Sequence, residues 1–143
     1  MSFTNDKISD NYITNKEEWF RIKDYIPKDK VIWCPFYCDG SMKDFFENNK
    51  GDIVIDNPPF SKKKEVLLRL KELDKPFILI CPSMMLSYKY FQKLFKDHIQ
   101  VIIPQSRIKF THLTYKDFKS YTPPYASFYF CYKMNLDKDL IFI

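Results

Sequence analysis

The chain has 143 residues, of which 45% are hydrophobic and 18% aromatic, and its net charge is +5. This length and composition predict one folded domain over residues 1–143 and exclude a disordered protein. No apolar stretch approaches the roughly 20 residues of a membrane span, and the first residues lack a signal-peptide pattern. We therefore expect an intracellular protein without a membrane partner. The positive charge suits a nucleic-acid partner, although many basic proteins have none.

Two residue types exclude further classes of site. Gly40 and Gly51 are the only glycines, which excludes glycine-rich phosphate loops such as G-x-G-x-x-G. Of the four cysteines, only Cys34 and Cys38 are close in sequence, and no second close pair completes a metal site. We therefore expect reduced thiols and no bound metal.

The predicted elements in the first third of the chain are short. Residues 1–13 are polar and are expected to be irregular. A helix is expected over residues 15–22, where acidic residues occupy the first turn. Residues 31–33 are expected to form a strand that Cys34-Pro35 ends, and residues 42–47 a weak helix after a loop.

The rest of the chain alternates between strand and helix patterns. β-Branched residues predict a strand at 52–55, and the spacing of valine and leucine predicts a helix over 62–73 with Ser61 as its N-cap. The remaining expected elements are strands at 77–80, 100–103, 125–132 and 140–143 and a helix at 88–95, with the last strand near a sheet edge. This alternation predicts an α/β fold with a mostly parallel sheet.

Three of the expected strands end directly in proline turns. Open parallel sheets bind their ligands beyond the carboxyl ends of the strands. We therefore expect Pro35, the turn 57–60 and Cys81-Pro82 to line one crevice at that edge of the sheet.

The turn Asn57-Pro58-Pro59-Phe60 carries the strongest chemical signal. Its two prolines fix φ and remove two backbone N–H groups, which makes the turn stiff. It would present one amide side chain, one free carbonyl and one aromatic ring, which could bind a planar base that carries an exocyclic amine. An isolated Asn-Pro-Pro is more often a plain turn, and Phe60 could instead pack under the following helix, so the surrounding sequence decides.

Two groups of basic residues are candidate nucleic-acid contacts. Lys62, Lys63 and Lys64 follow the proline turn and could bind phosphates, or could form a solvated helix face. Arg107 and Lys109 alternate with aromatic residues and could form a second strip on nucleic acid, with an exposed β-segment as the alternative.

Four segments, taken in this order, resemble motifs of one enzyme family: residues 12–19, 33–40, 44–46 and 57–60. They are similar to the adenine-specific DNA methyltransferases that methylate an amino group, most closely to small virus- and phage-encoded members. The turn Asn57-Pro58-Pro59-Phe60 fits the catalytic [D/N/S]-P-P-[Y/F] motif of that family. The other three segments resemble its T-P-x-x-x-W segment, its D-P-F-x-G-x-G-like loop and an Asp-Phe pair. The resemblance covers roughly residues 12 to 143.

The resemblance implies a Rossmann-like fold that uses S-adenosylmethionine to methylate the exocyclic amine of adenine in DNA. It makes Asn57, Pro58, Pro59 and Phe60 the catalytic turn. The cofactor-binding residues that it implies are Thr14, Trp19, Pro35, Phe36, Asp39, Gly40, Asp44 and Phe45. DNA or RNA is the implied partner, and the small size of the chain is compatible with a homodimer or a viral partner protein.

The chain departs from the family pattern between Gly40 and Asn57. About sixteen residues separate them, whereas the family normally fits there a helix, a strand ending in an acid that binds the cofactor ribose, and another helix. Cys34 and Cys38 also replace the acid and the glycine that are usual in the first loop. We therefore expect a fold shortened by a helix–strand unit and weak cofactor binding, in which Asp39 or Asp44 could take over the ribose.

Two other functions remain open from the sequence. The first is a catalytically inactive methyltransferase fold that binds nucleic acid or serves as a structural subunit of a virion, because the shortened segment removes an acid that the family uses. The second is a basic nucleic-acid-binding protein unrelated to methyltransferases.

Overall fold

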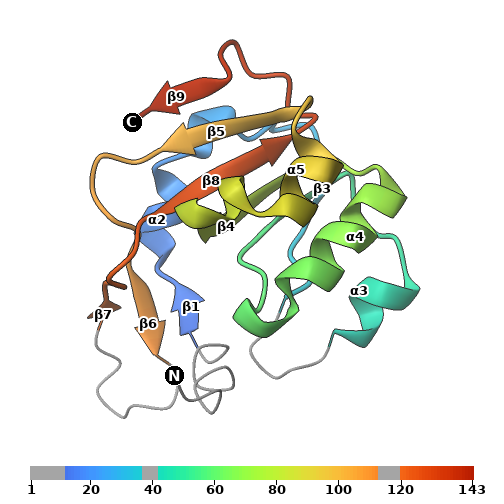
Figure 1. Ribbon diagram of the computed structural model, residues 1–143, viewed down its shortest axis with the longest axis horizontal. Helices are drawn as coiled ribbons and strands as arrows, with labels where there is room; N and C mark the ends of the chain where they lie inside the picture. Colours follow the sequence, from blue (N-terminus) through green and yellow to red (C-terminus); the bar gives the residue numbers. More distant parts are fainter. Residues whose placement is uncertain (1–11, 37–41, 113–119) are drawn as a thin grey trace.

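The computed structural model describes residues 12–36, 42–112 and 120–143, which form two β-sheets and flanking helices (Figure 1). The strands are β1 (Tyr12–Thr14), β2 (Ile32–Trp33), β3 (Ile53–Asp56), β4 (Phe77–Pro82), β5 (Ile99–Ile103), β6 (Phe110–His112), β7 (Ser120–Tyr121), β8 (Ser127–Tyr132) and β9 (Leu140–Phe142). The α-helices are α2 (Lys16–Phe20), α3 (Lys43–Glu47), α4 (Lys63–Leu73) and α5 (Lys89–Phe95). Short 3-10 turns lie at Lys23–Tyr25, Phe60–Lys62 and Ser83–Ser87.

The larger sheet has six strands in the order β2-β3-β4-β8-β5-β9, and the smaller has the order β1-β6-β7. Strands β2, β3 and β4 run parallel to one another, and β9 runs parallel to β5 at the far edge. These pairings confirm that β2, β3 and β4 are parallel neighbours and that the last strand lies at an edge, but β2 is an edge strand rather than the central strand expected from the sequence.

Strand β8 makes the larger sheet mixed rather than mostly parallel. It is antiparallel to both of its neighbours, β4 and β5. Among the described residues, no helix crosses the sheet between β5 and β8. The chain leaves the carboxyl end of β5, pairs in the small sheet as β6 and β7, and then enters β8 at the same end of the larger sheet. A strand that re-enters a sheet at the end where the preceding strand left it must run antiparallel to that strand.

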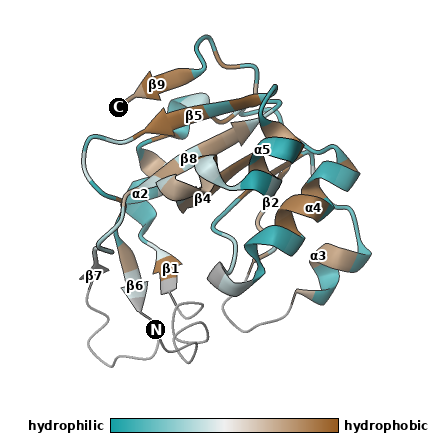
Figure 2. Ribbon diagram, viewed as in Figure 1, coloured by the Kyte–Doolittle hydropathy of each residue, from teal (hydrophilic) through white to brown (hydrophobic). Residues whose placement is uncertain are grey.

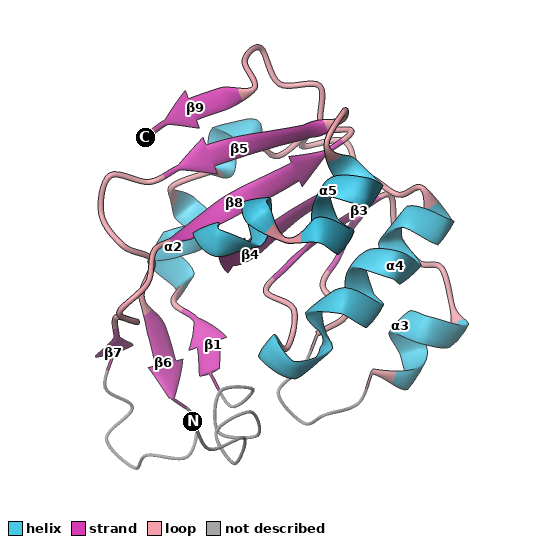
Figure 3. Cartoon of the chain, in the orientation of Figure 1, coloured by secondary structure: helices cyan, strands magenta, loops and turns pink. Residues whose placement is uncertain are grey.

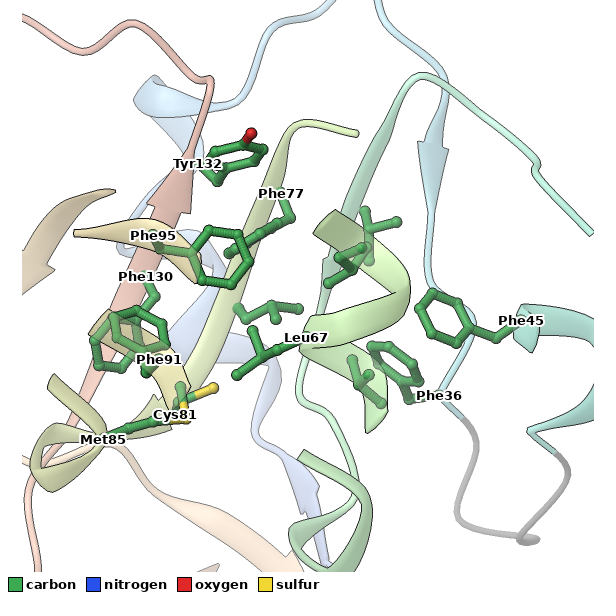
Figure 4. Close-up of a cluster of buried hydrophobic side chains, with 14 of the residues drawn as sticks. Phe36, Phe45, Leu67, Phe77, Cys81, Met85, Phe91, Phe95, Phe130 and Tyr132 are labelled. Atoms are coloured by element: carbon green, nitrogen blue, oxygen red, sulfur yellow. The ribbon is translucent and has the colours of Figure 1, made fainter. Parts of the chain in front are cut away.

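The two faces of the larger sheet bury different side chains because successive residues of a strand point to opposite sides. On β4, Phe77, Leu79 and Cys81 face a largely aromatic cluster that α4 and α5 cover, which Figure 4 shows. Ile78 and Ile80 face an isoleucine-rich cluster on the side of α2. Each fully buried side chain of this kind contributes roughly 1.5–3 kcal/mol to stability.

Helix α4 follows the expected amphipathic pattern. Val66, Leu67 and Leu70 are buried against the sheet, whereas its lysine-rich side faces outward, as the hydropathy colouring shows (Figure 2). The helix thereby covers β3 and β4 and fixes the turn that joins it to β3.

Most boundaries shift by one to three residues from the sequence prediction, and two differences bear on the site. Residues 12–14 form β1 rather than an irregular segment, because they pair with β6 about a hundred positions further along the chain. Ser61 does not occupy the N-cap position of α4: it lies inside the 3-10 turn Phe60–Lys62, and the N-cap residue is Lys62, which makes no side-chain cap hydrogen bond. Residues 1–11 lie outside the described part of the chain. Among the described residues, no helix is long and apolar enough to span a membrane.

Candidate active site

The site begins where the buried strand β3 ends at Asp56. One oxygen of the Asp56 carboxylate accepts a hydrogen bond from the backbone N–H of Phe36, and the other accepts one from the N–H of Asn57, each at 2.8 Å. The carboxylate therefore ties the loop after β2 to the turn after β3. Burial raises the pKa of Asp56 to about 7, against the opposing effect of these two N–H groups.

The sequence interpretation did not assign a role to Asp56. The available signal was an acid at the end of a fully apolar strand and directly before a proline turn. An acid in that position has to find donors at the sheet edge, because its carboxylate cannot reach bulk water freely.

The turn after Asp56 leaves the Asn57 carboxamide without a hydrogen-bond partner among the described residues. Pro58 is buried, and Asn57 and Pro59 are partly exposed. Within the described residues, the only hydrogen bond of Asn57 is the one that its backbone N–H donates to Asp56. Lys62 donates its N–H to the Pro59 carbonyl at 3.0 Å, which closes the 3-10 turn. As far as the described residues go, the carboxamide is therefore available to a ligand. Phe60 opens this turn, and its ring lies outside the described side chains.

The structure brings the first two proline turns together at one edge of the sheet. Pro35 is buried next to Phe36, whose N–H contacts Asp56. The parallel strands β2, β3 and β4 all point to this end of the sheet, and Figure 3 shows the arrows of the neighbouring β8 and β5 running in opposite directions. Cys81 and Pro82 differ from the expectation, because they continue β4 and are buried in its pairing with β8. A crevice shared by all three turns stays a prediction.

The residues expected to bind the cofactor fall into two groups. Thr14 lies in β1, and its hydroxyl is buried with no hydrogen-bond partner among the described residues. Buried hydroxyls without partners are rare, so this oxygen is suited to a ligand contact. Trp19 instead packs edge-on against Tyr129, with the ring centroids 6.3 Å apart, inside the isoleucine-rich cluster.

The second group belongs to β2, its loop and α3. Phe45 is fully buried, with its ring centroid 5.6 Å from that of Trp33 and 4.9 Å from that of Phe36. Asp44 forms a 2.8 Å ion pair with Lys50, and this pairing lowers the pKa of its carboxyl. Asp39, Gly40 and Cys38 lie outside the described residues. The structure therefore gives Phe45 a place in the core.

The basic residues expected on nucleic acid lie in two places that share the same sheet edge. Lys62 and Lys64 are exposed and Lys63 is partly exposed at the start of α4, which follows β3. Arg107 and Lys109 are exposed after β5, and β5 runs in the same direction as β3. Arg107 donates a hydrogen bond to the Pro123 carbonyl at 3.1 Å.

The cysteines show no sign of reactivity or metal binding in the described part of the chain. Cys34 is an exposed residue, but its thiol is partly shielded from water, and this shielding and, to a smaller extent, the nearby Asp56 charge raise the pKa of the thiol. Burial raises the pKa of Cys81 and of Cys131 to about 12. No three residues of the types His, Cys, Asp and Glu lie close enough together, among those described, to hold a metal ion.

Comparison with known proteins identifies the family. A family model described as adenine-specific methyltransferase EcoRI matches residues 48–130, which is more than half of the chain. The match starts just before β3 and ends within β8, so it includes the turn 57–60 and leaves out β1 and β2. Searches of curated proteins and of solved structures gave no match. The chain therefore belongs to the adenine-specific methyltransferase EcoRI family.

Proposed function

We propose that this protein transfers a methyl group from S-adenosylmethionine to the exocyclic amine of adenine in DNA. The observation that carries the proposal is the Asn57 carboxamide, which is held by a stiff turn and has no partner among the described residues. The family membership supplies the reaction class, and Asn57-Pro58-Pro59-Phe60 supplies the groups that the reaction needs.

The chemistry follows from the electronic structure of adenine. The lone pair of its exocyclic amine is delocalised into the ring, so the amine is a poor nucleophile. The Asn57 side-chain oxygen and the Pro58 carbonyl would each accept one N–H of the amine, which favours a pyramidal nitrogen and stabilises the positive charge that develops on it. Phe60 would stack on the base, and a base in a duplex would first have to leave the stack.

The residues present fit the cofactor in part. When bound, it supplies a methyl group carried on a sulfonium. The Thr14 hydroxyl, which has no partner among the described residues, and the loop of Pro35 and Phe36 would hold it, together with Asp39 and Gly40 by resemblance. The Asp56 carboxylate holds the backbone of that loop in position beside Asn57, which is how the chain would bring donor and acceptor together.

Transfer of labelled methyl groups tests this proposal directly. The protein is incubated with methyl-labelled S-adenosylmethionine and adenine-containing DNA, and the digested nucleosides are analysed for methylated adenine. A matched oligonucleotide in which hypoxanthine replaces adenine lacks the amine and should accept no label. If millimolar cofactor labels neither DNA nor RNA, the proposed activity is wrong.

One observation favours a second candidate, an inactive methyltransferase fold that binds nucleic acid or serves as a structural subunit. Among the described strands, β2 is the edge of its sheet, and α3 leads to β3 without a further strand. None of the strands described there carries the acid that the family uses for the cofactor ribose. Val31 and Phe46 are also exposed beside this edge, where a second copy of the chain or a viral partner protein could cover them. In this case DNA binding would persist without any methyl transfer.

A further inference from the structure

An open pocket of about 650 Å³ lies between the starts of α4 and α5. Its lining residues are Lys64, Ser87, Tyr88, Lys89, Tyr90 and Lys93. Helix α4 follows β3 and α5 follows β4, and these parallel strands point to the same edge, so the pocket lies at the edge that carries the Asn57 turn. Lys64 comes four residues after Phe60, about one helical turn.

Two tyrosines form the aromatic part of this pocket. The ring centroids of Tyr88 and Tyr90 are 5.8 Å apart, and their planes are inclined by 37°. Tyr90 packs against the aromatic core cluster, which fixes its position. Tyr88 is 36% exposed, so its ring is available to a ligand. Exposed aromatic rings held by a rigid neighbour are the usual platforms on which bases of single strands stack.

Three lysines make the same pocket positive. Lys64, Lys89 and Lys93 are exposed, and none of them forms an ion pair with a carboxylate in the part of the chain that the structure describes. The Lys64 ammonium lies 5.6 Å from the centroid of the Tyr90 ring, a cation–π contact that orders this side chain. Glu65 adds one negative charge near the three lysines. It also raises the pKa of Tyr90, but less than burial does.

We propose that this pocket binds the nucleic-acid strand next to the adenine that enters the site, with Tyr88 stacking on a flanking base and the three lysines contacting phosphates. Lysines alone on a helix face are commonly just solvated. Here they surround an exposed aromatic ring, next to a turn suited to an adenine. The proposal rests on the proposed function for its substrate, but strand binding does not require that methyl transfer occurs.

Binding measurements across a salt series test the proposal. Fluorescence anisotropy would follow a labelled single-stranded DNA oligonucleotide, and its RNA counterpart in a second arm. The slope of log affinity against log salt is negative. In the triple variant Lys64→Ala, Lys89→Ala, Lys93→Ala, we expect its magnitude to decrease by about 2, because three phosphate contacts are lost. The matched control is Lys23→Ala, Lys28→Ala, Lys30→Ala, which removes the same charge from exposed residues before the amino end of β2.

Substitutions of Tyr88 separate stacking from charge. Tyr88→Ala should weaken binding on the order of tenfold, because base stacking on an aromatic ring is lost. Tyr88→Phe keeps the ring and should bind like the native chain. Circular dichroism melting would show that these exposed positions leave the fold intact.

The outcomes distinguish this inference from the proposed function. Asn57→Ala should keep the salt dependence of native binding, because the amide carries no charge, while losing methyl transfer. If both lysine triples weaken binding equally, or if Tyr88→Ala binds normally, the pocket is not the strand site, whatever the methylation assay gives. If the pocket variants lose binding but the native chain never methylates, the strand site stands and the proposed activity falls.

Discussion

Two neighbouring segments at the carboxyl edge of the larger sheet differ in how much of the family pattern they keep. From β3 to β4, the chain lies inside the family match and keeps the Asn-Pro-Pro-Phe turn, whose Asn57 carboxamide has no hydrogen-bond partner among the described residues. From β2 to α3, it has a two-residue strand, a buried Phe45 and an ion-paired Asp44, and it lies outside that match. Asp56 joins the two segments. Under the proposed function, we infer from this difference that the groups that would hold the base are kept, whereas some of those that would hold the cofactor are lost.

The largest effect should come from Phe45→Ala. Because the ring is fully buried between Trp33 and Phe36, its removal should lower the free energy of unfolding by about 3–5 kcal/mol. Phe46→Ala is the matched control, since this neighbouring ring is 37% exposed and should cost much less. Thermal unfolding of both variants measures the difference. A Phe45→Ala protein with native stability but poor cofactor affinity would make Phe45 a cofactor contact instead.

Asn57→Ala should affect activity rather than stability. The carboxamide has no partner among the described residues, so stability should change by less than about 0.5 kcal/mol. Methyl transfer should fall on the order of 100- to 1,000-fold, because the lost acceptor acts on charge that develops during the reaction. The control is Asn49→Ala at an exposed position. Equal rates for the native chain and Asn57→Ala would remove the turn from the mechanism.

Asp56 should make stability depend on pH. Its pKa is raised from an ordinary value near 4 to about 7 in the folded protein, so the folded state binds the extra proton in that range. Its contribution to stability is therefore complete below pH ~4, falls as pH rises towards 7 by up to about 1.4 kcal/mol per pH unit, and is absent above. Asp56→Asn should lose this part of the slope in denaturant titrations at several pH values. The same slope in both proteins would show that Asp56 ionises normally.

Asp44→Asn should have the smallest effect of the four. The Asp44 carboxylate is exposed and already paired with Lys50 and with the Asn48 amide. Exposed ion pairs contribute little, so we expect cofactor affinity to change by less than about threefold. A tenfold loss of cofactor affinity in calorimetry would show that Asp44 leaves Lys50 to bind the ribose. The cofactor pocket would then be more complete than the comparison of the two segments implies.

The sequence predicted the parts of the fold that local patterns determine. Strands β3 and β4 and helices α4 and α5 follow from apolar runs and helical spacing, because burial on a face imposes a period on nearby residues. The small sheet did not follow, since Tyr12 pairs with His112 and no short-range signal marks such a partner. The antiparallel entry of β8 was missed for the same reason.

The candidate site was predictable only where it is local. The turn at Asn57 is readable because its stiffness comes from its own prolines. The role of Asp56 depends on the N–H of Phe36, twenty residues earlier, and the burial of Phe45 depends on Trp33 and Phe36. Such contacts between separate loops exist only after the sheet has formed.

Calorimetric titration of the native chain with S-adenosylmethionine tests the central contrast most directly. If the turn that would hold the base is intact and part of the cofactor pocket is lost, the cofactor should bind with a Kd of roughly ten to several hundred micromolar. The reason is that losing a hydrogen bond to a charged group costs about 1.5–3 kcal/mol. Asn57→Ala should give the same value. Low-micromolar binding would contradict the partial loss of the cofactor pocket. No binding at millimolar concentration would contradict the proposed methyltransferase activity.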